Sequence, residues 1–407
     1  MIVHSYYDED PRVRREAEAL VAAGRPVDVF GLRRPGDDAD GRLAGVRVHR
    51  LDVQRHQGAG FTVYLGEYLS FLVRAAWAVT RAHRRRRYGV VQVHSLPDFL
   101  VFAALPLKLA GVPVILDLHE AMTELFATRF PRLDRWPLRP LLLLSERLAA
   151  GFADRILTVN EAMHARLLAI GIRPSKVAIV PNSPDLRRFD AADHVARVFR
   201  EDGRLRVVYT GAVTPVYELD VVIDAIAQLA SERPDLGVQL DVYGRGDFEP
   251  ALRARAEERG IADRVTFHGR IPFEAVPAAV AASDIGLAPT RRDAYTDATL
   301  STKLFEYGAM RKPVVATWLP LVERTFGPDA VATYASGDID GLVAAIAAIA
   351  DDAAARDARV ADMATRVAEH GWARAAARYL DIVDGLAAGG PTGDVSAGGR
   401  SPGADGG

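Results

Sequence analysis

The sequence predicts an α/β protein of two doubly wound domains, each built on a mainly parallel sheet. The chain has 407 residues, and one hydrophobic core stops growing at roughly 250 to 300 residues. Short apolar runs rich in β-branched residues alternate with longer amphipathic stretches, as in repeated strand–helix units. The alternation restarts at LRVVYTG (205–211), so a second sheet is expected after a junction near residues 187–204.

The front half begins with a strand and a helix whose ends are clearly marked. Asp10 can cap a helix over residues 11–23, Pro11 fits its first position, and Gly24 follows its end. The expected strands of this half lie near residues 1–5, 26–31, 45–50, 90–94, 113–118, 155–159 and 177–180.

The back half repeats the alternation and then becomes helical. Its expected strands lie near residues 205–211, 238–243, 264–268, 284–288, 313–316 and 330–334. The Ala-rich segment 337–386 predicts two or three helices, and the Gly/Pro/Ser-rich segment 388–407 predicts a disordered tail. The predicted units are two domains, 1–190 and 191–365, a helix over 366–387 that returns to the first domain, and the tail 388–407.

Composition excludes several classes of protein. With 49% hydrophobic and 26% charged residues, the chain resembles an average globular protein. There is no Cys, which excludes disulfides, thiolate metal sites and Cys nucleophiles. The most apolar stretches, 61–80 and 96–116, contain charges and do not predict membrane spans. The N-terminus lacks the pattern of a signal peptide, so we expect a cytoplasmic protein.

Charge is unevenly distributed along the chain. Residues 1–190 contain 28 Lys and Arg against 21 Asp and Glu, a balance of +7, so the remainder carries −9 of the total of −2. This asymmetry favours an acidic surface or acceptor at the front half. Residues 61–87 pass from an aromatic-rich segment into Arg81 and Arg84–Arg87, a pattern typical of helices that rest on anionic membranes. The alternative is a core-facing helix with a solvated cationic end.

Ligands of open parallel sheets bind beyond the carboxyl ends of the strands. Asp117-Leu118-His119-Glu120 follows the strand VPVIL, which places an imidazole and a carboxylate where a cleft is expected. His94 ends the strand VVQVH in the same way. Both His residues have a structural alternative, in which the ring only satisfies backbone groups.

Two glycine sites follow strands of the back half. Thr210-Gly211 precedes a helix, and a glycine there lets a phosphate approach backbone N–H groups. Gly244-Arg245-Gly246 follows VQLDVY, but the third Gly of a dinucleotide fingerprint is missing, so we reject a dehydrogenase.

The segment 296–317 contains the richest set of candidate residues. A helix is expected to open after Thr299 or Ser301, with Lys303 and Glu306 one turn apart on one face. The cation can hold a phosphate and the carboxylate can accept two ribose hydroxyls. The alternative is an exposed ion pair of little energetic weight.

Several stretches in this order resemble the GT-B glycosyltransferases, specifically the large retaining group called family 4. The resemblance spans roughly residues 2–325 and implies two Rossmann-like domains facing each other across a cleft. It also implies a nucleotide-diphosphate sugar on the C-terminal domain and an acceptor on the N-terminal domain. The matching stretches are 10–30, 90–99, 113–126, 156–172, 177–189, 263–289 and 300–317.

The resemblance implies roles for individual residues. Glu306 matches the second Glu of the family's E-x7-E motif, which holds the donor ribose, and His119 matches a His near the donor sugar. Gly211 matches a glycine near the diphosphate, and Asn182 a residue at the domain junction. The full predicted set is catalytic His119, Glu120 and Asp297; donor-binding Gly211, Gly244, Arg245, Lys303, Leu304 and Glu306; and acceptor-side Asp10, Arg12, His94 and Asp98.

The sequence departs from the family pattern at the donor site. The first Glu of the E-x7-E motif is replaced by Ala298, and adjacent Asp297 substitutes only if the loop shifts by one residue. The Arg and Lys that usually clamp the diphosphate are absent, because Ala212 and Tyr217-Glu218 stand there. Lys303 is the first candidate replacement and Arg245 the second.

The function predicted from these features is retaining hexosyl transfer from a nucleotide-diphosphate sugar to an acceptor hydroxyl, in glycan, glycolipid or glycosylated-metabolite synthesis. No metal ion or other cofactor is expected, and no nucleic acid. A nucleotide-sugar 2-epimerase of the same fold, or an inactive donor-binding or scaffold protein, remains an alternative. Contact with the inner face of an anionic membrane through residues 61–87 is a further expectation.

Overall fold

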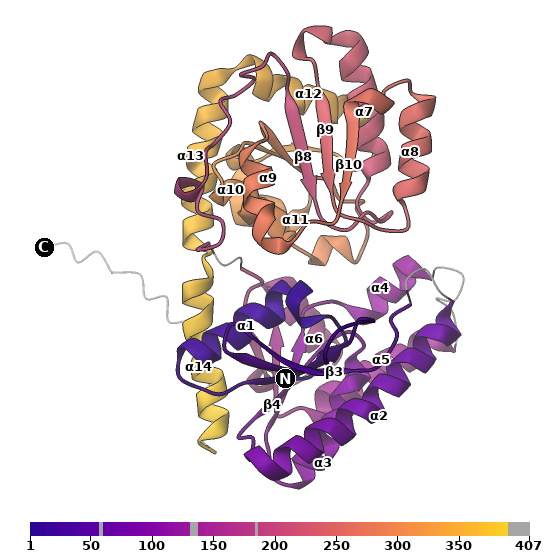
Figure 1. The fold of residues 1–407 in the computed structure, drawn as a ribbon, viewed down its shortest axis with the longest axis vertical. Coiled ribbons are helices and arrows are strands. Elements are labelled where there is room, and N and C mark those ends of the chain that lie inside the picture. The colour runs from indigo at the N-terminus through magenta and orange to yellow at the C-terminus, as the bar shows by residue number, and fades with distance from the viewer. Residues whose placement is uncertain (57–59, 131–136, 184–185, 390–407) are drawn as a thin grey trace, which may run out of the picture.

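The computed structural model describes residues 1–56, 60–130, 137–183 and 186–389, and it forms two α/β lobes (Figure 1). The predicted tail falls mostly in 390–407, outside the described residues. No helix in the described part of the chain is both long and apolar enough to cross a bilayer.

The N-terminal lobe contains two sheet segments of order β1-β3-β2 and β4-β5-β6-β7. Ile2 makes bridges to Phe30 of β1 and Val93 of β4, and so joins the segments. The strands are β1 (Asp28–Leu32), β2 (Asp40–Leu43), β3 (Val46–Leu51), β4 (Val91–His94), β5 (Val114–Leu118), β6 (Arg155–Thr158) and β7 (Val177–Ile179). All pairs are parallel except β2 with β3.

Two differences from the predicted strands are found in this lobe. The expected strand 1–5 is reduced to the bridges of Ile2. Strand β2 was not predicted, because its exposed residues, Asp-Gly-Arg-Leu, lack an apolar alternation, and it is held only by pairing with β3. The expected helix is α1 (Pro11–Ala22), and the Asp10 side chain accepts from the backbone N–H of Val13 at its N-terminus.

The remaining helices of the N-terminal lobe cover the sheet. They are α2 (Phe61–Arg86), α3 (Leu105–Leu109), α4 (Met122–Arg129), α5 (Leu138–Phe152) and α6 (Glu161–Ala169). A 3₁₀ segment at Asp98–Ala104 contacts both α2 and α5, so these two long helices lie over the same side of the lobe (Figure 1).

The C-terminal lobe is a single parallel sheet of order β10-β9-β8-β11-β12-β13. Its strands are β8 (Arg206–Thr210), β9 (Gln239–Tyr243), β10 (Val265–Gly269), β11 (Ile285–Ala288), β12 (Val314–Thr317) and β13 (Ala332–Tyr334). Its helices are α7 (Leu219–Glu232), α8 (Glu249–Glu258), α9 (Val276–Ala281), α10 (Thr302–Ala309), α11 (Pro320–Ala330), α12 (Ile339–Asp351) and α13 (Ala353–Glu369). The fold is therefore the predicted pair of doubly wound parallel-sheet domains.

The last helix, α14 (Trp372–Ala387), crosses back from the C-terminal lobe (Figure 1). It contacts α1, and its buried Trp372, Tyr379 and Val383 share one hydrophobic core with N-terminal residues such as Val13. The preceding helix α13 contributes Met363 and Val367 to a core of the C-terminal lobe. The domain limits at residues 190 and 365 stay a prediction.

Candidate functional site

A cavity of about 570 Å³ lies between the two lobes. Its N-terminal wall comes from the segments that follow β5, β6 and β7, as expected for the carboxyl ends of parallel strands. Its C-terminal wall comes from the loop before α10, from α10 itself and from α11. The lining includes His119, Glu120, Asn160, Asn182, Tyr217, Tyr295, Thr296, Ala298, Thr299, Thr302, Lys303, Arg324 and His370.

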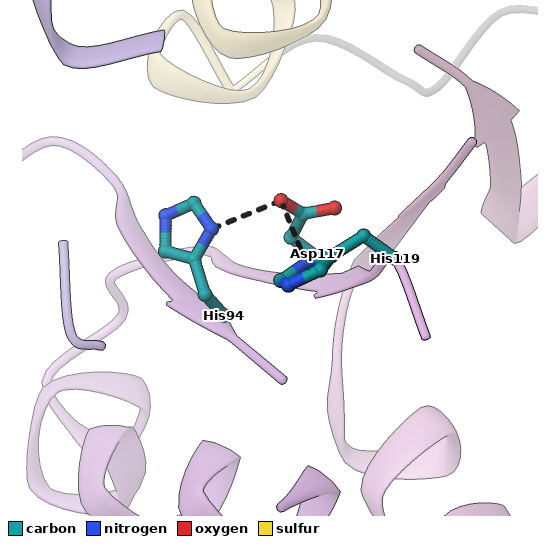
Figure 2. A group of neighbouring side chains, drawn as sticks. All are labelled: His94, Asp117 and His119. Atoms are coloured by element: carbon teal, nitrogen blue, oxygen red, sulfur yellow. Dashed lines mark hydrogen bonds and ion pairs between the residues drawn. The ribbon is translucent and has the colours of Figure 1, made fainter. Parts of the chain in front are cut away.

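His119 is held at the cavity by a carboxylate from its own strand. Its Nδ1 lies 3.6 Å from Asp117 Oδ2, and the same oxygen lies 2.9 Å from Nδ1 of His94 (Figure 2). Burial lowers the pKa of His119, but the interactions with Asp117, joined by the charge of Glu120, together outweigh burial and raise it above the ordinary value. Burial raises the pKa of neighbouring Glu120; His119 partly offsets this, and the charge of Asp10 adds to it.

The group His94, Asp117 and His119 has the composition of a metal site, and its ligand atoms lie within 4.8 Å of one another. Both Asp117 oxygens, however, accept hydrogen bonds from Arg12, at 2.7 Å from Nε and 2.8 Å from Nη2. A guanidinium this close repels a cation and uses the carboxylate lone pairs. The arrangement therefore suits an internal ion pair better than a metal ion.

Lys303 is the principal cation of the opposite wall. It lies in the first turn of α10 and is buried. Its Nζ lies 4.0 Å from the Tyr217 ring centroid, and Glu306, one turn later, interacts with it electrostatically. No carboxylate of the described residues, however, forms an ion pair with Lys303, and burying an ammonium without a close anion is costly. Lys303 is therefore poised to receive an anionic ligand from the cavity.

Gly211 makes room for the Lys303 side chain. A Cβ built at Gly211 would lie 2.5 Å from Lys303 Cε, and the backbone φ of +142° also disfavours other residues. The second glycine site packs against the first, since a Cβ at Gly244 would lie 1.7 Å from the Gly211 carbonyl oxygen. The role of Gly244 is therefore close packing of two loops, and it is not among the residues that line the cavity.

Glu306 lies one turn after Lys303 on α10 and is buried. Burial raises the pKa of its carboxyl, while Lys303, Thr302 and Arg15 of α1 partly offset that rise. Glu306 is not among the residues lining the cavity, although Thr302 and Lys303 beside it are. Its carboxyl lies behind the wall, close to the junction of the two lobes.

A second cavity, of about 410 Å³, opens within the N-terminal lobe. His119 and Glu120 line both cavities, so the two meet at the carboxyl end of β5. Asp10 also lines it, while its carboxylate caps α1 and accepts from the Ser5 hydroxyl. The walls contain six aromatic side chains, namely Phe61, Tyr64, Tyr68, Phe99, Phe126 and Phe130.

Several predicted site residues lie outside both cavities. The side chain of Arg12 is buried in its pair with Asp117, so it does not face an acceptor. Leu304 belongs to the hydrophobic core behind α10. Asp297 pairs with Arg292, at 2.9 Å from Nε, so the loop does not shift to place it at position 298. Arg245 is exposed and is not a lining residue.

His94 and Asp98 are buried beneath the second cavity. His94 is fully buried, and its Nε2 has no hydrogen-bond partner in the described residues. Asp98 is also buried, and burial together with the charge of Glu146 raises the pKa of its carboxyl well above the usual range. Neither residue lines a cavity, so their placement differs from the predicted acceptor contact.

Sequence reasoning missed two residues of the site, Asn160 and Arg324. Asn160 caps α6 and donates from Nδ2 to the Ala298 carbonyl across the lobes at 3.0 Å. Arg324 of α11 adds an exposed cation to the cavity wall. Asn160 carries a usable signal, since it follows a strand and precedes a helix, whereas Arg324 lies in the second turn of α11, away from any strand end.

Glu218 stands where the resemblance expects a phosphate-binding Lys. It is fully buried and accepts hydrogen bonds from the Thr317 hydroxyl, the Ser336 hydroxyl and the Gly337 backbone N–H. Glu218 therefore joins the loop before α7 to the ends of β12 and β13. Its charge is satisfied internally and does not oppose a ligand in the cavity.

Comparisons with known proteins match both lobes of the chain to glycosyltransferases. A glycosyl transferase 4-like domain matches residues 10–183, and a glycosyl transferases group 1 domain matches residues 204–352. The chain is 26% identical over 289 residues to a 2-deoxystreptamine glucosyltransferase of Streptomyces kanamyceticus, covering 69% of this chain and 67% of the relative. It is 26% identical over 386 residues to a D-inositol 3-phosphate glycosyltransferase of Thermobispora bispora, covering 90% and 87%.

A solved structure shares the whole architecture. Sucrose-phosphate synthase from Thermosynechococcus elongatus superposes with a TM-score of 0.76 at 18% identity, covering 95% of this chain and 99% of that one. The two matched domains, the relatives and this likeness agree with the two lobes and the cavity between them. The chain therefore belongs to the GT-B glycosyltransferases of the family 4 type.

Proposed function

We propose that this glycosyltransferase moves a hexosyl group from a nucleotide-diphosphate sugar to an acceptor hydroxyl with retention of configuration. The observation that carries the proposal is the meeting of two cavities at His119 and Glu120, one of them containing the unpaired cation Lys303. The C-terminal domain, residues 191–365, provides the donor side, and the N-terminal domain, residues 1–190, the acceptor side.

The donor side uses protein cations in place of the missing clamp. Lys303 neutralises the diphosphate, and Gly211, which does not itself line the cavity, leaves the space that the Lys303 side chain occupies. Arg324 is near enough to the cavity to add charge. Glu306 accepts hydroxyl hydrogen bonds from the ribose, which requires that its carboxyl be reached through a small rearrangement at Thr302.

Retention requires little from protein bases. The acceptor hydroxyl attacks the anomeric carbon on the face from which the nucleoside diphosphate leaves. The bond from the anomeric carbon to the phosphate oxygen breaks with its electron pair on that oxygen, which then takes the hydroxyl proton. The protein positions both substrates and stabilises the negative charge on the leaving group.

The proposed use of protein cations predicts that activity is undiminished in EDTA. A strict requirement for a divalent cation would contradict transfer by protein cations alone.

The acceptor side suits a hydroxylated ring. The relatives named above act on 2-deoxystreptamine and D-inositol 3-phosphate, both polyhydroxylated rings. The aromatic walls of the second cavity offer faces for such a ring, and Glu120 and Asp10 offer hydrogen-bond acceptors for its hydroxyls. Arg55 also lines this cavity, so its lining holds one guanidinium beside these two carboxylates.

The proposal is tested with a panel of UDP-, GDP-, ADP- and TDP-sugars in a thermal-shift assay, because a ligand of the folded state raises its stability. One donor is expected to stabilise the wild type and not Lys303→Met, with Lys303→Arg intermediate. Arg311→Met removes an exposed cation outside the cavity and serves as control. Loss of the shift in the control as well, or none in the wild type, would contradict the donor site.

The product of the reaction decides between the enzyme classes. With the selected donor and an aminocyclitol or inositol phosphate, transfer yields a glycosylated ring and a nucleoside diphosphate. An isomeric sugar nucleotide formed without any acceptor would identify an epimerase. Donor binding without turnover, restored by Ala298→Glu, would identify a protein that has lost activity at the altered motif.

We further propose that α2 rests on the anionic inner face of the cytoplasmic membrane. Leu65, Leu69, Val73 and Trp77 recur every fourth residue and are exposed, the last by 67%. They lead into exposed Arg81, Arg84 and Arg85. Arg86 does not belong to this surface, because it pairs with Asp28.

Vesicle sedimentation tests the membrane contact. Replacing Arg81, Arg84 and Arg85 together by Ser is expected to reduce binding to vesicles containing anionic lipid. Replacing exposed Arg374 and Arg378 of α14 is expected to leave it unchanged. Equal vesicle binding by both variants would contradict the proposed membrane contact of α2.

A further inference from the structure

Asp117 is a buried carboxylate that contacts Arg12, His94 and His119 beside the two cavities. We infer that it is a positioning residue, which keeps the His119 imidazole charged and directs Nε2 of that ring into the cavity between the lobes. That cavity, which Lys303 lines, is the proposed donor cavity. The inference rests on the proposed function, because it assigns a task to a residue of the proposed site.

The geometry fixes which nitrogen of His119 faces the substrates. Nδ1 is buried and has no hydrogen-bond partner in the described residues, and its nearest anion is Asp117 Oδ2 at 3.6 Å. His119 itself is only partly buried and lines both cavities. With Nδ1 turned inward, Nε2 is the nitrogen available to a ligand.

Asp117 is itself held by a buried polar chain. Arg12 donates to both of its oxygens and also lies 3.2 Å from Glu16 Oε1. Gln92 donates to the other Glu16 oxygen at 2.6 Å, and the Tyr379 hydroxyl donates to Gln92 at 2.7 Å. Residues of α1, β4 and α14 thus fix the orientation of the Asp117 carboxylate. A carboxylate fixed in this way can in turn fix the orientation of the His119 ring at the cavity wall.

Arg12 also fixes the charge of Asp117. Burial opposes ionisation of this carboxyl, but Arg12 and the two imidazoles outweigh it and hold the pKa of Asp117 well below its usual range. An ionised carboxylate on the inner side of His119 favours the imidazolium form.

Other charges around His119 do not reverse this balance. Glu120 favours the charged ring and Arg12 opposes it. Asp98 interacts electrostatically with His119, but burial, with the charge of Glu146 adding to it, raises the pKa of its carboxyl well above the usual range and so disfavours its negative charge. His94 shares the Asp117 oxygen, and its ring centroid lies 6.3 Å from that of His119. His94 is fully buried, so it competes for the carboxylate without reaching a ligand.

The charged ring gives the donor cavity a cation on its N-terminal wall, in addition to Lys303 and Arg324 on the C-terminal wall. Its Nε2–H donates a hydrogen bond to an oxygen of the bound sugar or phosphate, and its charge opposes the growing negative charge on the leaving group. No proton leaves His119 in this role. It replaces, from the N-terminal lobe, part of the positive charge that Ala212 and Glu218 remove from the usual clamp.

The test is an NMR titration of protein labelled with ¹⁵N-histidine, with the His119 signals assigned by their loss in His119→Asn. In the wild type His119 is expected to titrate above the ordinary value of about 6.5. In Asp117→Asn its pKa is expected to fall by about 1 to 3 units. The signals of His268, in the C-terminal lobe, are expected to stay unchanged and serve as control.

Two outcomes overturn the inference. One is a wild-type His119 that is neutral at pH 6.5, a result that needs no variant and holds even if Asp117→Asn fails to fold. The other is a folded Asp117→Asn in which His119 titrates as in the wild type. Neither measurement requires a bound donor. A contradiction of the role of Asp117 can therefore be distinguished from a contradiction of the donor site, which the nucleotide-sugar panel tests.

Discussion

At the scale of single residues, the proposed ribose contact of Glu306 predicts that donor affinity depends on pH. Its carboxyl has a raised pKa in the free protein because it is buried. A ribose that donates two hydroxyls requires the ionised form, so binding lowers that pKa and releases a proton. Affinity for a nucleotide sugar, whose diphosphate does not titrate in this range, is therefore expected to fall as the pH is lowered from 8 towards 5.

Glu306→Gln is expected to weaken donor binding roughly 10- to 100-fold, the loss of charged hydrogen bonds. The same substitution should abolish the proton release, measured as the difference in calorimetric heat between two buffers. Glu257→Gln, on the exposed face of α8, is the matched control. An unaltered pH dependence in Glu306→Gln would assign the ribose contact elsewhere.

The structure places some of the predicted site residues at the cavity between the lobes and others away from it. His119, Glu120 and Lys303 follow strands or open a helix, positions that topology places at the cavity. Arg12 and Asp297 carry equally suitable chemistry, but their ion pairs with Asp117 and Arg292 turn them elsewhere. Such partners lie far apart in sequence or on an irregular loop, and a strand–helix pattern does not specify them.

At the scale of elements, the alternation of apolar runs was sufficient to predict most strands of both sheets. The exceptions have a physical cause, since β2 is exposed and antiparallel and depends on β3 for its hydrogen bonds. The return of α14 to the first lobe is encoded in residues such as Trp372 and Tyr379, whose burial needs the surface of α1. Periodicity predicts that α14 is a helix, and only packing specifies which lobe it covers.

Asp28 attaches the end of α2 to the sheet. It is buried at the start of β1 and accepts from Arg47 of β3 at 2.5 Å, from Arg86 of α2 and from the Tyr88 hydroxyl. Burial opposes ionisation, but interactions with His49, Tyr88 and Arg47 outweigh it and hold the pKa of Asp28 below its usual range. Its stabilising effect is therefore complete above the ordinary carboxyl pKa of about 3.9 and is lost as the pH falls through the lower folded-state value.

Asp28→Asn is expected to reduce the free energy of unfolding by roughly 2 kcal/mol at pH 7, between the values for surface and buried pairs. The difference from the wild type should shrink when urea unfolding is measured below about pH 4. Asp52→Asn, an exposed carboxylate outside this cluster, should change stability little. If the difference in free energy of unfolding between Asp28→Asn and the wild type stayed constant with pH, the ionised carboxylate would not be the stabilising group.

At the scale of the whole molecule, the donor cavity exists only while the lobes face each other. Ion pairs such as Arg14 with Glu274 cross between them at 3.2 Å, but Glu274 is exposed and such pairs stabilise little. The hydrogen bond from Asn160 to Ala298 crosses at the cavity itself. It joins the end of β6 to the loop that departs from the family's motif, so the closed arrangement depends on backbone at position 298.

The substitution Asn160→Asp tests whether this hydrogen bond keeps the two lobes together, because it should leave the stability of the fold almost unchanged. A carboxylate still accepts from the Met163 N–H and caps α6, so thermal stability should change by less than about 0.5 kcal/mol. It can no longer donate to the Ala298 carbonyl and instead repels it, so the lobes should open. We expect a larger radius of gyration in small-angle scattering and a several-fold weaker donor affinity, whereas Asn160→Ser, which keeps the cap without the charge, should lie between the two. If donor affinity stayed at the wild-type level in Asn160→Asp, the cavity would have to assemble through the remaining contacts between the lobes.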